Sequence, residues 1–150
     1  MTAGHGNTAN QVLDAVEAYN DLLAQMMEVT QALSLCVESW DSERVRRLLD
    51  KRSEICSSMG RCAAVLDRLI PQARAWADQR SVDRLDTMLE QAGAQLQDIL
   101  QKQQECENRV IERLEKCRAE LAALGRQREV KAAYSPRTQA AEARFLDGRL

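Results

Sequence analysis

Apolar residues recur along this chain at alternating steps of four and three, the spacing that places side chains on one face of an α-helix. The first row contains Val12, Val16, Tyr19, Leu23, Met26, Leu33, Val37 and Trp40, with Thr30 as its polar member. The second contains Val45, Leu48, Leu49, Ile55, Met59, Cys62, Leu66 and Leu69. The third contains Val82, Leu85, Leu89, Ala92, Leu96, Ile99, Gln103, Cys106, Val110, Leu114, Cys117, Leu121 and Leu124. Such rows predict helices that bury one face against each other.

Helix boundaries follow from residues that start or stop helices. Trp40, Asp41 and Ser42 offer capping oxygens after the first row, and Ser81 offers one before the third. Pro71 disfavours helix at the end of the second row, although residues 72–78 could form another turn or two. Gly125 favours a stop after the third row. We therefore expect an all-α antiparallel bundle with long helices at about residues 10–39, 43–70 and 82–124. A short C-terminal helix or tail would follow, and the ends at 1–8 and 136–150 would be flexible.

Composition supports helices in place of sheets. Aromatic residues make up 3% of the 150 residues and charged residues 29%, with 6 glycines and 2 prolines. This usage is typical of long packed helices, and the length suits a single domain spanning residues 1–150.

Charge is unevenly distributed although the formal net charge is only −2. No Lys or Arg precedes Arg44, whereas residues 44–52 are rich in both, so an antiparallel hairpin would bring opposite charges near each other. Surfaces that bind single-stranded nucleic acid usually combine basic grooves with stacking aromatics, and no aromatics are interleaved here. We expect no nucleic-acid partner. The absence of a leader-like segment and of a long apolar run predicts a cytoplasmic protein without membrane insertion.

Catalytic and metal-binding signatures are missing from the sequence. It has no glycine-rich phosphate loop, GxSxG or HExxH motif, and His5 is its single histidine. The five cysteines are an odd number without CxxC spacing, so reduced thiols that pack as small apolar groups are expected. These patterns predict neither an enzyme nor a bound metal or cofactor. A metal protein built on the scattered Cys and Glu residues remains an alternative that metal analysis would test.

A more specific pattern spans residues 110–134. It comprises Val110, Leu114, Glu120, Leu121 and Leu124, followed by a short basic connector and by Ala133 and Tyr134. The pattern resembles that of FliT-type flagellar export chaperones. Earlier parts of the chain fit the same resemblance, with Tyr19 in the opening helix and with Trp40 and Asp41 before an Arg-rich helix. The resemblance covers most of residues 10–135 and extends to the sister FlgN-type chaperones.

This resemblance implies a helical protein that binds the C-terminal helices of a filament-cap or hook-associated export substrate. It would keep that subunit from assembling early and deliver it to the export gate, with the export ATPase complex as a further partner. In that family a C-terminal segment covers the binding surface, and a tyrosine after the last long helix contributes to docking on the gate. Tyr134 matches that tyrosine, although Ser135 stands where members tend to have glycine and the tail with Phe145 and Leu146 is unlike theirs. The predicted partner-binding residues are Val110, Leu114, Leu121, Leu124, Tyr134, Phe145 and Leu146.

Two alternatives fit the same residues. Tyr134 could instead fill a corner near Gly125, since an amphipathic tyrosine suits either setting. The whole chain could be a structural coiled-coil adaptor that forms a homodimer through its third helix.

Overall fold

The computed structural model describes residues 3–135, and these residues form three long helices. They are α1 (Ala3–Ser39), α2 (Ser42–Trp76) and α3 (Gln79–Ala133), and no strand occurs in that range. The predicted all-α class with three long helices is therefore confirmed. The chain divides into two units, residues 1–108 and residues 109–150.

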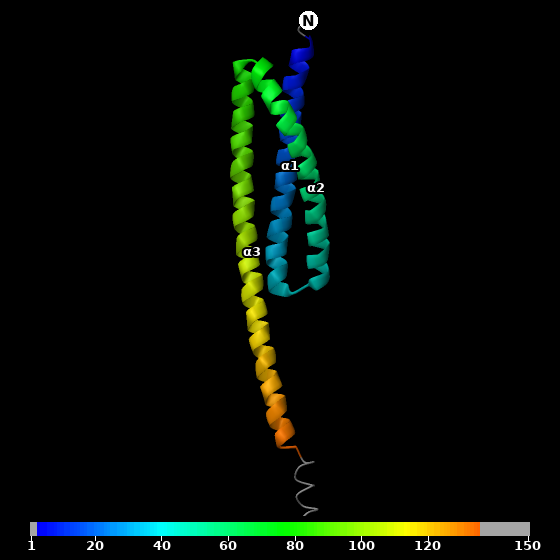
Figure 1. Ribbon diagram of the computed structural model, residues 1–150, viewed down its shortest axis with the longest axis vertical. Helices are drawn as coiled ribbons and strands as arrows, with labels where there is room; N and C mark the ends of the chain where they lie inside the picture. Colours follow the sequence, from blue (N-terminus) through cyan, green and yellow to red (C-terminus); the bar gives the residue numbers. More distant parts are fainter. Residues whose placement is uncertain (1–2, 136–150) are drawn as a thin grey trace, which may run out of the picture. The chain divides into compact units, whose positions relative to one another are not determined.

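The first unit is a bundle in which α1, α2 and the first part of α3 run side by side with alternating direction (Figure 1). All three helices contribute to two apolar clusters. One cluster is built around Leu23, Ile55 and Ile99, and the other around Val16 and Leu85. The largest fully buried side chains all belong to α1, and they are Leu23, Val12, Val16, Val29 and Cys36. α1 is thus the helix that the other two cover.

The predicted apolar rows describe most of this core. In α1 the row is buried from Val12 to Val37 except at Tyr19, which is half-buried. Its polar member Thr30 is satisfied because its hydroxyl donates to the Met26 carbonyl oxygen at 2.8 Å. Trp40 and Leu49 are exceptions, because both are exposed. Trp40 lies in the turn after α1 with a φ of 53°, so its backbone is no longer helical and its side chain does not continue the row.

The turn between α1 and α2 contains the cap of α2, which is Asp41 among the three predicted candidates. The Asp41 side chain accepts a hydrogen bond from the backbone N–H of Arg44 at 3.0 Å. That N–H is one of the donors that the first turn of a helix leaves unpaired, so the bond stabilises the start of α2.

The predicted end of the second helix at Pro71 is wrong, because α2 continues to Trp76 with Pro71 inside it. A proline within a helix costs about 3 kcal/mol, chiefly through a lost hydrogen bond and a steric clash. Beyond Pro71, Ala73 is buried in the cluster that contains Val16 and Leu85. Leu69 and Ile70 before the proline also pack against this cluster, so apolar contacts favour helix on both sides of it.

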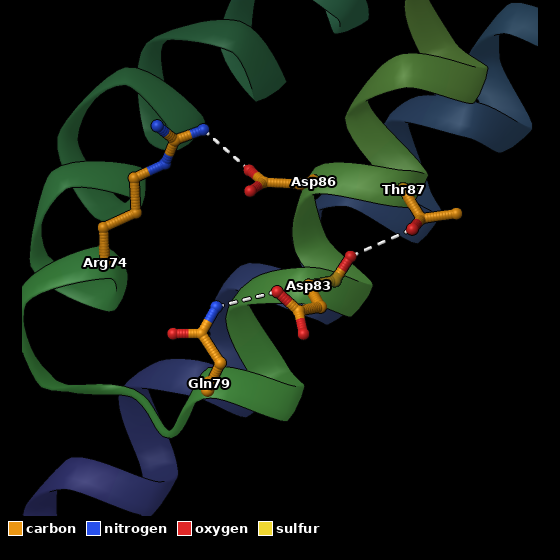
Figure 2. Close-up of polar contacts among 5 residues, drawn as sticks. All are labelled: Arg74, Gln79, Asp83, Asp86 and Thr87. Atoms are coloured by element: carbon orange, nitrogen blue, oxygen red, sulfur yellow. Dashed lines mark hydrogen bonds and ion pairs between the residues drawn. The ribbon is translucent and has the colours of Figure 1, made fainter.

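Polar side chains lie around the corner between α2 and α3 (Figure 2). Arg74 of α2 reaches Asp86 of α3 with 2.8 Å between nitrogen and oxygen, and this pair joins the two helices. Within α3, Asp83 accepts from the Gln79 side-chain amide at 2.8 Å through its carboxylate and from the Thr87 hydroxyl at 2.9 Å through its backbone carbonyl. α3 begins at Gln79, slightly before the predicted cap at Ser81. All three contacts are exposed and therefore contribute little to stability.

Two further boundaries differ from the sequence prediction. α1 begins at Ala3 and not near residue 10, since adding residues to an established helix is much easier than nucleating one. The predicted break at Gly125 is wrong, because α3 continues to Ala133 and no glycine in the described chain has a positive φ. Alanine, leucine, arginine and glutamine surround Gly125 and favour helix, so the helix continues through it. The described residues therefore contain no separate C-terminal helix.

Candidate partner-binding site

The C-terminal portion of α3 carries an apolar row that is open to solvent. We call Val110, Leu114, Cys117, Leu121 and Leu124 the distal row. Leu114, Leu121 and Leu124 are 43%, 68% and 54% exposed, and the other two members are half-buried. In the described stretch from residue 109 to residue 135, no side chain is buried. Large apolar side chains are thus left uncovered at the spacing that buries them elsewhere in this protein.

The core residues of α3 differ from the distal row in burial. Leu85, Ala92 and Ile99 have the same periodicity as the distal row, and all three are buried. They belong to the first unit, where α1 and α2 cover them. The distal row lies in the second unit, where α3 is the helix that the described residues form.

Helical geometry gathers the distal row on one face. At about 100° per residue, its five members fall within roughly 80° of the helix circumference. The exposed side chain of Ile111 widens this face on one side, and the small residues Ala122 and Gly125 lie on the same side. A Cβ added at Gly125 would meet no atom within 4 Å. The result is an apolar strip with small side chains along one edge, which is the kind of surface on which a second helix can lie.

The charges around this strip are mixed. Arg113 and Arg118 border the distal row on its two sides, and Glu107 and Glu120 are acidic residues that border it. Neither sign of charge dominates the border of the strip.

Tyr134 lies apart from the distal row. It follows the last residue of α3, is 81% exposed, and its backbone N–H donates to the Val130 carbonyl oxygen at 3.2 Å. By helical spacing it is about a third of a turn away from the centre of the row, on the side that Val130 occupies. The corner-packing alternative for Tyr134 is wrong, because α3 runs straight through Gly125 and the ring is open to solvent. Its contact with an export gate stays a prediction.

The structure brings four of the seven predicted binding residues together, namely Val110, Leu114, Leu121 and Leu124. Phe145 and Leu146 lie outside the described residues. Sequence reasoning missed Ile111 and Val130, which are also exposed, because neither falls on the heptad spacing that was used to find the row. The signal that could have found Ile111 is its spacing of three residues from Leu114, which places the two side chains next to each other on a helix.

Other kinds of site were sought in the described residues. They contain no group of three or more His, Cys, Asp or Glu side chains placed to hold a metal ion. The five cysteines are free thiols, with Cys36 buried and Cys56 exposed. Among the helices described, none combines the length and the apolar character needed to span a membrane.

Comparison of the chain with protein-family models, with curated proteins and with solved structures finds no match. The residues and geometry of the distal row are therefore the features that bear on function.

Proposed function

We propose that this protein is a flagellar type III export chaperone that binds the C-terminal helices of a filament-cap or hook-associated subunit. Binding would cover the assembly helices of that subunit and prevent its premature polymerisation before delivery to the export gate. The proposed setting is the cytoplasm, and the role requires no catalytic group, metal or cofactor.

The exposed distal row is the observation that carries the proposal. Leaving large apolar side chains in water is unfavourable by about 25 cal/mol per Å² of apolar surface, so a contiguous uncovered row indicates a surface that acquires a partner. Its heptad-like spacing suits an amphipathic helix, because a partner helix with the same spacing can interdigitate with it. Subunits that assemble through amphipathic helices expose the apolar faces of these helices before assembly. A chaperone can cover those faces in place of the neighbouring subunit.

The remaining parts of the proposal rest on the resemblance. Tyr134 is exposed at the end of α3, as a residue that docks on an export gate or export ATPase complex needs to be. The segment with Phe145 and Leu146 is proposed to cover the distal row until a client arrives. Gate docking by the tyrosine and covering of the row by the tail are both features of the FliT-type family that the sequence resembles.

The first test is binding of the full chain to the C-terminal helices of a filament-cap subunit, measured by isothermal titration calorimetry. We expect binding by the natural protein and a loss of at least tenfold in affinity for Leu114→Asp with Leu121→Asp, since both changes put charge into an apolar contact. Ala119→Asp with Ala123→Asp is the matched control, because these residues lie on the face away from the row. The control should bind as the natural protein does.

A truncation after Ser135 complements this test, because it removes the tail while leaving α3 intact. Tighter binding by the truncated chain would support the proposed covering of the row. The proposal would be refuted by the absence of binding to cap or hook-associated subunits in both the full and the truncated chain.

A structural homodimer is the second candidate, because the distal row could equally accept the row of another copy. Light scattering distinguishes the two functions. A monomer whose mass is independent of concentration would dismiss the scaffold, and a stable dimer that binds no export subunit would favour it.

A further inference from the structure

We infer that a second surface of this protein, on α2, docks a helix that carries acidic residues beside an apolar one. The surface is centred on Leu49, and we call it the Leu49 face. Its members are Arg46, Leu49, Arg52, Ser53, Cys56 and Gly60. It lies in the first unit of the chain, so this inference does not depend on the distal row or on the export function proposed for it.

Leu49 is the apolar centre of this face. Its side chain is 47% exposed, although the apolar row of α2 predicted it to be in the core. By helical spacing it lies about 100° or more round the helix from Ile55 and Leu66, which are buried. Leu49 therefore points away from the part of α2 that packs in the bundle. A large apolar side chain in this setting gains free energy when a partner covers it.

Two arginines flank Leu49. Arg46 precedes it by three residues and Arg52 follows it by three, so each lies about 60° from it round the helix, on opposite sides. Neither side chain forms a hydrogen bond or an ion pair with any other described residue. The acidic residues of α1, the helix that packs beside α2, therefore do not pair with them. Both positive charges are available to a partner.

The acidic residues in this part of α2 lie elsewhere on the helix. Glu43, Asp50 and Glu54 are each about 100° or more from Leu49 round the helix. On their side, Glu43 pairs with Arg47. Asp50 is four residues from Arg46, yet these two side chains form no ion pair in the described structure. The Leu49 face thus carries two positive charges and no negative one.

Small residues extend the face toward the C-terminus of α2. Ser53, Cys56 and Gly60 lie within about 40° of Leu49 round the helix, and all three are exposed. A Cβ added at Gly60 would meet no atom within 4 Å. A second helix can therefore approach α2 closely along this line, with Leu49 and the two arginines at one end of the contact.

This arrangement fits a particular charge pattern in the partner. A helix with Glu three residues before and three residues after a leucine repeats the spacing of the two arginines about Leu49. When it packs along α2, its leucine covers Leu49 and each carboxylate meets one guanidinium. A second copy of the Leu49 face is disfavoured as the occupant, because arginines would face arginines.

Thiol footprinting tests this inference directly, because the face contains its own reporter. Cys56 is exposed, whereas Cys36 is buried and Cys117 in the distal row is half-buried. Two synthetic helical peptides of about five turns are added to the full chain. Each has one leucine between two charged residues at the spacing given above, and these are Glu in one peptide and Lys in the other. Mass spectrometry follows the rate at which iodoacetamide alkylates each cysteine as the peptide concentration rises.

We expect the Glu peptide to slow alkylation of Cys56 and to bind about fivefold more tightly than the Lys peptide, which is the effect of two exposed ion pairs. Arg46→Gln with Arg52→Gln should make the two peptides bind equally. Arg46→Gln alone, at an exposed position, should reduce the preference to about twofold.

Arg44→Gln with Lys51→Gln is the matched control. It removes the same charge from the same part of α2, but both residues lie about 140° or more from Leu49 round the helix. The control should keep most of the preference for the Glu peptide.

The outcomes separate this inference from the proposed function. Slower alkylation of Cys117 without any change at Cys56 would place the peptide on the distal row and would overturn the inference. Equal protection of Cys56 by both peptides would overturn the charge selection, and no protection of Cys56 by either would overturn the docking surface. None of these results bears on whether a filament-cap subunit binds the distal row.

Discussion

Leu23 and Leu121 are the same residue type on similar apolar rows, yet their side chains meet different surroundings. Leu23 is 1% exposed and sits in a cluster with residues of α2 and α3, whereas Leu121 is 68% exposed. The free energy that a leucine contributes depends on the apolar area that folding removes from water. At the residue scale, the first stabilises the fold and the second is available for binding.

Truncation of these two leucines to alanine tests that assignment. We expect Leu23→Ala to lower the free energy of unfolding by about 2–5 kcal/mol, because it leaves a cavity in the core. Leu121→Ala should change it by at most about 0.5 kcal/mol, because little burial is lost. Urea denaturation measures both. Equal destabilisation by the two substitutions would show that the distal row is part of the folded core.

Residue patterns in the sequence predicted much of the core accurately. The rows identified Val16, Leu23 and Ile99 as core residues, and Asp41 as a cap. The periodicity could not reveal that Leu121 and Leu124 are uncovered, since a repeat shows which face of a helix is apolar but not what lies against it. Exposure depends on how far neighbouring helices extend, which is a property of the whole bundle.

At the scale of elements, two helix ends were predicted too early, each for a different reason. The sequence prediction ended α2 at Pro71 and α3 at Gly125 on local preference, and both helices continue. At Pro71 the contacts of the following turn with the core outweigh the local cost, which local sequence does not report. At Gly125 the neighbouring residues favour helix strongly enough to include a glycine.

Gly125→Ala distinguishes a helical glycine from a helix-ending one. In the structure, an added Cβ would meet no atom within 4 Å and the backbone is helical, so alanine should stabilise this part of α3 by about 0.5–1 kcal/mol. Amide hydrogen exchange should slow in the turns around residue 125. Faster exchange would indicate a left-handed glycine at a helix end, as the sequence alone suggested.

At the scale of the whole molecule, the two units differ in how their apolar residues are covered. The first unit, residues 1–108, contains all of the buried core residues among the described part of the chain. The second contains the distal row and Tyr134, which are accessible. A protein built this way can bind and release a guest helix through its second unit without disturbing the core that keeps the first unit folded.

Hydrogen exchange with and without the C-terminal helices of a filament-cap subunit tests this account most directly. Amides that lie in a helix without tertiary cover exchange readily, because the helix opens locally at little cost. We predict that adding the subunit slows exchange in residues 109–124 of α3 and leaves α1 and α2 unchanged. Protection confined to the first unit, or no protection anywhere in the chain, would contradict the claim that the distal row binds a partner helix.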